Sequence, residues 1–354
     1  MNDYTPFLKF KTGEIGALKA LDKAERSNIT PFFDLARPSS DEKPENIPLK
    51  IKGTIEKGVR KYQLNFKDVD GFYIDDYDID DAIMIDGASV YEFLVNKFSE
   101  LPFIPVIGLD RDPSRVDVLL DEAIRSNTFA LRVTREDFMS YELIEDDLHD
   151  LFEKLNDKYS CCHLIIDCRL CLNLDVVDIS NQIIRFASAI TDEFAFEKII
   201  IAGSSVSASL TNDILPPSSE ISIARNECAI FNNVTNELDL RIGIGDYTTV
   251  SPNYSDVNMP GGMLRSITAP KLIYCYDNMQ YFIRGGALEQ HPRGNKQYDD
   301  MCCTLINKGF YRPNYSDGDR YFTDKAQGIG VDAQPHSIVK YLVNAHMTYM
   351  INDY

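Results

Sequence analysis

Short apolar segments rich in β-branched and aromatic residues recur along the chain, and each is followed by a longer segment in which apolar residues return at helical spacing. Such an alternation of strand and helix patterns is typical of parallel β–α–β units. The segments predicted as strands are 4–10, 29–35, 71–74, 103–109, 128–133, 163–166, 198–202 and 238–244. The helices predicted between them cover 14–26, 49–62, 88–98, 114–125, 142–155, 176–189 and 221–231.

The number and spacing of these strands favour a closed barrel. Eight strands fall within about 245 residues, close to the usual length of a (β/α)₈ domain. Continuous apolar runs such as 164–166 and 199–201 are typical of parallel strands that are buried on both faces. A doubly wound open sheet is the main alternative, but no G-x-G-x-x-G motif follows the first strand. We therefore predict an α/β fold with a TIM-type (β/α)₈ barrel over residues 1–250.

The pattern changes after the eighth strand. Residues 251–265, which include Pro252 and Pro260, are predicted as a loop. A β-hairpin is predicted over 271–284 and helices over 299–307 and 337–350, with an irregular stretch around Pro313 and Gly318 between the helices. We expect residues 251–354 to form a smaller α+β extension packed on the barrel.

Polar or charged residues follow the predicted strands at their C-terminal ends, where barrel enzymes have their active sites. The candidates taken from these positions are Lys9, Lys11, Glu14, Asp34, Asp75, Asp110, Arg111, Arg132, Asp167, Arg169, Gly203, Ser204, Ser205, Asp246 and Tyr247. A solvated loop would explain a polar residue at one strand end. It does not explain a series of them in which Lys9 and Arg132 lie inside apolar runs. Buried charges need partners, so the series favours a functional pocket, with a structural ion-pair network as the alternative.

The residue types at these ends limit the chemistry. Asp75, Asp110, Asp167 and Asp246 are candidates for acid–base catalysis, and their oxygens suit Mg²⁺. The other candidates are assigned to ligand binding. The cations among them are expected to hold a phosphate. The Gly203-Ser204-Ser205 loop lies at the usual phosphate site of barrels. No histidine ends a predicted strand, so neither a Ser-His-Asp triad nor a histidine-rich zinc site is expected there. A Schiff base on Lys9 and a carboxylate pair acting on a glycoside remain open.

Net charge and cysteine content limit the kinds of partner, the location and the state of the thiols that we expect. The net charge of −19 disfavours a broad nucleic-acid surface or an anionic membrane as partner, and leaves a small molecule or a basic protein. The sequence contains neither an apolar run of membrane-spanning length nor a signal-peptide pattern, so a cytoplasmic location is expected. The adjacent pairs Cys161-Cys162 and Cys302-Cys303 lack zinc-ligand spacing, which predicts buried free thiols.

Several short motifs in order along the chain point to one family. They are Tyr4-x-Pro6-x-Leu8-Lys9-x-Lys11-x-Gly13-Glu14, the segment 105–110, Gly203-Ser204-Ser205, Gly245-Asp246-Tyr247 and the segment 344–348. With these motifs the chain resembles the beta family proteins, the phage-type beta protein family. The resemblance implies a protein of phages or bacterial mobile elements and a setting of phage–host conflict, without implying a reaction. Many relatives have proline where this chain has Val206, so the resemblance does not imply the shape of that loop.

Two functional hypotheses follow. The first is a barrel that acts on or binds a phosphorylated or nucleotide-like small molecule at its rim, as a Mg²⁺-assisted hydrolase or phosphodiesterase if it is an enzyme. The alternative is a non-catalytic acidic binding or regulatory subunit in a defence or toxin–antitoxin complex. A structural subunit that makes contact through the hairpin at 271–284 is a third interpretation.

Overall fold

The computed structural model describes residues 3–39, 42–208, 214–254 and 268–354, which fall into two compact units. The first unit consists of residues up to Phe10, 27–204 and 226–247. The second consists of 11–26, 205–225 and 248–354.

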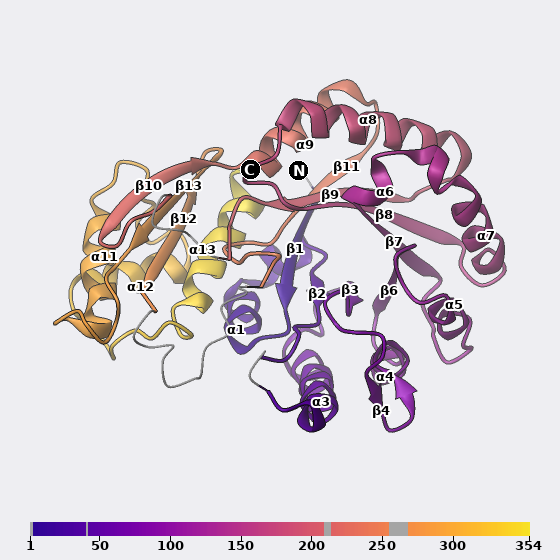
Figure 1. Cartoon of the computed structure of the whole chain (residues 1–354). Coiled ribbons are helices and arrows are strands. Elements are labelled where there is room, and N and C mark those ends of the chain that lie inside the picture. The colour runs from indigo at the N-terminus through magenta and orange to yellow at the C-terminus, as the bar shows by residue number, and fades with distance from the viewer. Residues whose placement is uncertain (1–2, 40–41, 209–213, 255–267) are drawn as a thin grey trace. The chain divides into compact units, whose positions relative to one another are not determined.

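The first unit is a closed eight-stranded barrel in which every strand runs parallel to its neighbours (Figure 1). In the order in which they are hydrogen-bonded, its strands are β1 (Tyr4–Lys9), β11 (Ile242–Asp246), β9 (Lys198–Ser204), β8 (Cys161–Leu170), β7 (Thr128–Thr134), β6 (Phe103–Ile107), β3 (Phe72–Asp75) and β2 (Phe32–Asp34). The predicted TIM-type barrel is therefore confirmed.

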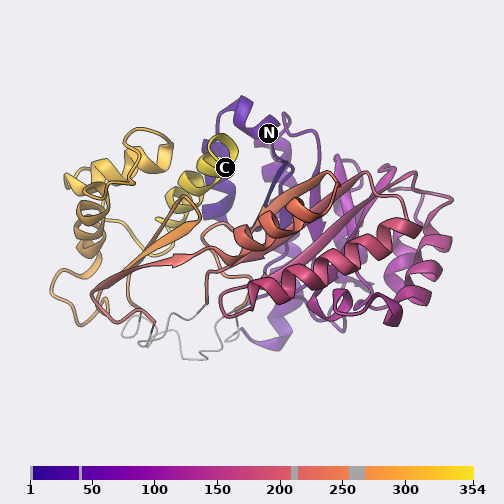
Figure 2. The ribbon, with the colours of Figure 1, turned by 90° about the horizontal axis from the view of Figure 1, so that it is seen from above.

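Helices form the outer layer of the barrel. They are α3 (Ile47–Asn65), α4 (Val90–Phe98), α5 (Ser114–Leu119), α6 (Arg135–Phe138), α7 (Glu145–Leu155), α8 (Val176–Glu193) and α9 (Asn226–Glu237). The long helices α8 and α9 pack side by side on the outside of the sheet (Figure 2). Short elements complete the unit: η1 (Pro44–Asn46), η2 (Tyr141–Leu143) and the two-stranded ribbon of β4 (Met84–Ile85) and β5 (Ala88–Ser89).

Apolar side chains fill the interior of the barrel. The residues that do so are Phe7, Phe32, Tyr73, Val106, Ala130, Ile165, Ile200, Ala202 and Tyr247. The rings of Phe7 and Phe32 stack with their centroids 4.2 Å apart, and the ring of Tyr247 lies 4.9 Å from that of Phe7. This layer closes the barrel, so a site at its C-terminal end has an apolar floor.

The second unit is built on an antiparallel sheet with the strand order β10-β13-β12. Its strands are β10 (Ser219–Ala224), β12 (Lys271–Tyr276) and β13 (Met279–Arg284). Its helices are α1 (Thr12–Ala20), α2 (Lys23–Ser27), η3 (Gly294–Lys296), α11 (Gln297–Ile306), α12 (Asp317–Ala326) and α13 (Val339–Asn352). Residues of β12, β13, α11, α12 and α13 share one apolar core, and the hairpin predicted over 271–284 is confirmed.

Some predicted elements differ from the structure. The helix predicted over 221–231 is wrong at its start, because residues 219–224 pair with β13 as strand β10 and the helix begins only at Asn226. The stretch around Gly318 is helical, since the side chain of Ser316 caps α12 by accepting a hydrogen bond from the backbone N–H of Asp319. The last barrel strand lies at 242–246 rather than 238–244. Most of the loop predicted over 251–265 lies outside the described residues.

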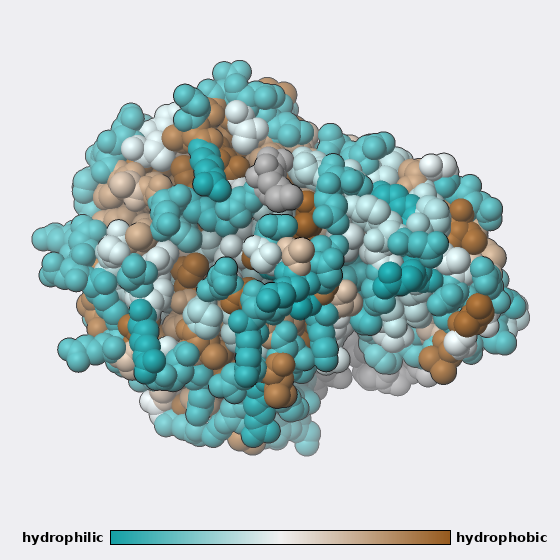
Figure 3. Space-filling view, turned by 180° about the vertical axis from the view of Figure 1, so that it is seen from behind, coloured by the Kyte–Doolittle hydropathy of each residue, from teal (hydrophilic) through white to brown (hydrophobic). Residues whose placement is uncertain are grey.

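One face of the molecule is strongly polar. Hydrophilic side chains cover most of the face shown in Figure 3, and apolar ones are scattered among them. This agrees with a net charge of −19. Within the described residues, no helix combines the length and the apolar character that a membrane crossing requires.

Two glycines of α3 give a matched test of packing in the barrel wall. A Cβ added at Gly58 would overlap the Phe10 ring, which packs against Phe33 and Phe98, whereas a Cβ added at Gly53 would meet nothing within 4 Å. We predict that Gly58→Ala lowers the free energy of unfolding by about 1–3 kcal/mol, because the ring has to move. Gly53→Ala should raise it by about 0.5–1 kcal/mol through helix propensity. Urea unfolding of the two variants measures both effects, and equal shifts would contradict this packing.

Candidate functional site

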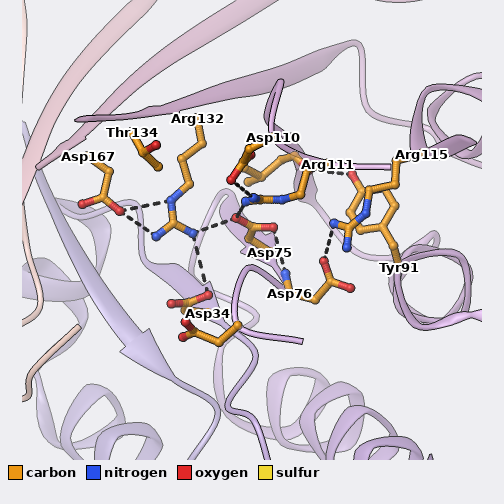
Figure 4. Close-up of polar contacts among 12 residues, drawn as sticks. Asp34, Asp75, Asp76, Tyr91, Asp110, Arg111, Arg115, Arg132, Thr134 and Asp167 are labelled. Carbon is orange, nitrogen blue, oxygen red and sulfur yellow. Dashed lines mark hydrogen bonds and ion pairs between the residues drawn. The ribbon is translucent and has the colours of Figure 1, made fainter. Parts of the chain in front are cut away.

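A fully buried arginine occupies the centre of the C-terminal end of the barrel, called here the mouth (Figure 4). Arg132 lies on β7, and its guanidinium reaches carboxylates of the adjacent strand β8 and of β3, which is two strands away. Its Nη2 is 2.6 Å from Oδ2 of Asp167 on β8, and its Nη1 is 2.7 Å from Oδ2 of Asp75 on β3. Its Nη2 also donates to the hydroxyl of Tyr247 at 2.9 Å, and that hydroxyl donates to Asp167. The predicted residues from four separate segments therefore do converge.

The electrostatics of this centre favour charged side chains despite their burial. Burial opposes the charge of Arg132, but Tyr247, Asp167, Asp34 and Asp75 hold its pKa well above the usual value. Burial also raises the pKa of Asp75, but its arginine neighbours outweigh that effect and lower it overall. Arg132 and Asp75 are consequently an ion pair at neutral pH.

Two further arginines extend the network outward from Asp75. Arg111 places Nη2 3.1 Å from Asp75 and Nη1 2.6 Å from Asp110, whose side chain is 35% exposed. Arg115 places Nη1 2.6 Å from Asp76. Burial raises the pKa of Asp76 to about 6, although Arg115 lowers it in part.

The aromatic ring of Tyr77 lies among three guanidinium groups. The Cζ atoms of Arg111, Arg132 and Arg169 are 4.4, 4.5 and 4.3 Å from its centroid. Tyr77 is half-buried and belongs to the loop that follows β3. The next residue, Asp78, pairs with Arg169 at 3.2 Å and with Lys9 at 3.4 Å, which holds this loop over the mouth.

Asp34, the last residue of β2, is buried at the same mouth but is poorly paired. Its nearest cation is Arg132, with Nη1 3.8 Å from Oδ1. Within the described part of the chain, neither oxygen of Asp34 accepts a hydrogen bond. Burial is the main reason that the pKa of Asp34 rises to about 7, with Asp78 and Asp75 adding to the rise. Asp34 is therefore a buried carboxyl group that is partly protonated at neutral pH.

The remaining predicted residues have other surroundings. Asp246 accepts a hydrogen bond of 2.8 Å from the hydroxyl of Tyr4. At Gly203 a Cβ would lie 2.6 Å from the Cys171 sulfur, so close packing requires glycine there. Ser204 is buried in β9, while Lys11, Glu14 and Ser205 belong to the second unit.

The mouth carboxylates are held mainly by arginines. Among the described residues, the one group of three metal-ligand side chains with ligand atoms within 4.8 Å of one another is Glu145, His149 and Glu193, on the outer helices α7 and α8. Sequence reasoning also missed Tyr77, Asp78 and Arg115. The run Asp75-Asp76-Tyr77-Asp78 directly after a buried strand was the available signal for the first two.

The raised pKa of Asp34 makes stability depend on pH. Between the ordinary aspartate pKa of 3.8 and about 7, the folded protein keeps a proton on Asp34 that the unfolded chain releases. Stability due to this group therefore falls as the pH rises through that window, and the full penalty remains above it. Asp34→Asn cannot ionise, so its melting temperature should fall less than that of the wild type between about pH 5 and about pH 8.

Differential scanning calorimetry across that range measures the difference. The exposed Asp70→Asn is the matched control and should follow the wild type. Parallel curves for wild type and Asp34→Asn would show that Asp34 does not titrate in this window.

Comparison with known proteins gives one family. A family model described as "Beta protein" matches residues 4–352, which is nearly the whole chain. Neither the curated proteins nor the solved structures compared with this chain give a match. The family match agrees with the motifs at both ends of the sequence, and the chain belongs to the Beta protein family.

Proposed function

We propose that the barrel mouth binds a nucleotide-like small molecule whose planar ring takes the place now held by Tyr77. The observation that carries this proposal is the arrangement of Arg111, Arg132 and Arg169 around one aromatic ring, at 4.3–4.5 Å. Guanidinium groups stack on aromatic faces, and such contacts are strongest where water is excluded. A mouth built in this way favours planar ring systems over flexible aliphatic ligands.

The Tyr77 side chain is one that a ligand can displace from this position. It belongs to a loop rather than to a barrel strand, and its side chain is only half-buried. Two of the three arginines that surround it are held independently of its loop, Arg132 by Asp167 and Arg111 by Asp110. Moving the Tyr77 ring outward would therefore leave these two guanidinium groups in place for the ring of a ligand.

In the proposed complex, Asp34 forms hydrogen bonds with polar atoms of the ligand ring. A buried polar group without a hydrogen bond costs about 1–3 kcal/mol, and a ligand that satisfies it recovers part of that cost. With a pKa of about 7, Asp34 can accept a hydrogen bond from an exocyclic amine or donate one to a ring nitrogen. The Nε of Arg111 is also buried without a hydrogen-bond partner within the described residues.

A phosphate group would bind more weakly than a ring at this site. The outer guanidinium groups of Arg111 and Arg169 already pair with Asp110 and Asp78. A phosphate has to displace one of these carboxylates before it can accept the same N–H groups. We therefore expect the ring to provide most of the affinity and the phosphate a smaller part.

Binding fits the geometry better than catalysis. Asp75 and Asp167 would have to leave Arg132 before they could hold Mg²⁺ or move a proton, and the buried guanidinium would lose both partners. Asp110 is the more exposed carboxylate and the better candidate for contact with Mg²⁺. Mg²⁺-assisted hydrolysis at Asp110 is thus a narrower form of the proposal, tested by adding Mg²⁺ to the same assay.

Thermal-shift measurements with adenosine, AMP and ribose 5-phosphate test the proposal. A ligand at about 100 times its dissociation constant adds about 2.7 kcal/mol to the stability of the protein that binds it. We predict that adenosine and AMP raise the melting temperature and that ribose 5-phosphate has a smaller effect. A response to ribose 5-phosphate alone would contradict the stacking role of the mouth.

Three variants test whether the thermal shift comes from binding at the mouth. Arg111→Gln should lose most of the nucleotide response, and Tyr77→Ala should increase it because the ligand ring no longer has to displace a side chain. Arg125→Gln is the matched control, since Arg125 is exposed and pairs only with the exposed Glu100 among the contacts described. If no ligand shifts the wild type, the small-molecule proposal fails and a basic protein partner becomes the next hypothesis to test.

A further inference from the structure

Two cysteines at the end of β8 have the spacing C-x-x-C. Cys168 and Cys171 flank Arg169 and Leu170, directly after the mouth residue Asp167. All eight cysteines of the chain are free thiols in this structure. The adjacent pairs Cys161-Cys162 and Cys302-Cys303 lack this spacing.

The backbone turns sharply between the two cysteines. The pairing of β8 with β9 shifts register between Asp167 and Leu170, and Arg169 adopts a left-handed conformation with φ of 53°. After this turn the N–H of Cys171 donates to the carbonyl of Ser204 at 2.7 Å, and the Cys171 thiol donates to the carbonyl of Arg169 at 3.7 Å. The turn therefore holds Cys171 against β9, the strand that pairs with the one carrying Cys168.

Gly203 on the neighbouring strand leaves the space that both cysteines use. A Cβ at this position would lie 2.6 Å from the Cys171 sulfur and 3.5 Å from the Cys168 Cβ. The two side chains therefore converge on one point of β9. This close approach and the short loop between the residues are what an intramolecular disulfide requires.

We infer that Cys168 and Cys171 form a reversible disulfide when the protein meets a peroxide. Cys168 retains 4% exposure and Cys171 none, so Cys168 reacts first. Its thiolate attacks one oxygen of hydrogen peroxide, the O–O bond breaks, and a sulfenic acid and one water result after proton transfer. The sulfur of Cys171 then attacks the sulfenic sulfur, the S–S bond forms, the S–O bond breaks, and a second water leaves with the Cys171 proton.

The disulfide would act on the mouth through the two residues beside it. The N–H of Arg169 donates to Oδ1 of Asp167 at 2.9 Å, while Oδ2 of Asp167 holds Arg132. Arg169 also contacts the Tyr77 ring and pairs with Asp78. A bond that closes the turn between Cys168 and Cys171 changes the backbone that sets the positions of Asp167 and Arg169. This link to ligand binding rests on the proposed function, whereas formation of the disulfide does not.

Oxidation with hydrogen peroxide, alkylation of the remaining thiols after unfolding, and peptide mass mapping test the inference. The expected result is a peptide cross-linked between Cys168 and Cys171 that dithiothreitol returns to two thiols. The exposed Cys303 reports in the same sample that the peroxide was active. If Cys303 is oxidised while Cys168 and Cys171 stay alkylatable, the inference is overturned.

Matched variants separate the disulfide from its effect on the mouth. Cys168→Ala and Cys171→Ala should each abolish the cross-link, while Cys228→Ala, which removes another buried thiol, should leave it unchanged. Oxidation should weaken AMP binding severalfold in the wild type and in Cys228→Ala but not in the two C-x-x-C variants. A cross-link that forms in a protein that never binds AMP would support the disulfide and count against the proposed function alone.

Discussion

The burial of one guanidinium group governs the C-terminal end of the barrel. Arg132 is 0% exposed, and an uncompensated charge in that position would cost more than the fold could supply. Asp167, Asp75 and the hydroxyl of Tyr247 satisfy its N–H groups from three other strands or strand ends. A substitution at any of these residues would therefore leave Arg132 without one of its partners. The same contacts hold the strand ends of the mouth in position.

Aromatic rings cover both sides of this charged layer. The Cζ of Arg132 is 5.1 Å from the centroid of Phe32 in the barrel interior and 4.5 Å from that of Tyr77 in the mouth. Phe32 belongs to the closed barrel core, whereas Tyr77 belongs to a loop. The Phe32 ring is thus a fixed part of the core, and the Tyr77 ring is the one that a planar ligand could replace. The C-x-x-C turn adjoins this layer through Asp167 and Arg169, which connects the two proposals at a single strand end.

Much of this arrangement could be predicted from local sequence patterns. The βα alternation predicts the barrel, and an arginine inside the apolar run 129–133 predicts a buried charge that needs partners. The partner of each group could not be predicted, because the pairing of Arg132 with Asp75 joins positions 57 residues apart. Strand β10 was missed because its pairing with β13, distant in sequence, overrides the local helical spacing. Tyr77 was missed because an aromatic residue in a loop carries no periodic signal.

The measurement that tests the account most directly is a double-mutant cycle on the free energy of unfolding for Arg132→Met and Asp167→Asn. Removing Arg132 alone should cost about 3–5 kcal/mol, because it leaves buried carboxylates without their cation. The double variant should be more stable than the sum of the single effects predicts, with a coupling of about 0.5–3 kcal/mol. Additive effects, or an Arg132→Met variant as stable as the wild type, would contradict the central role of this ion pair.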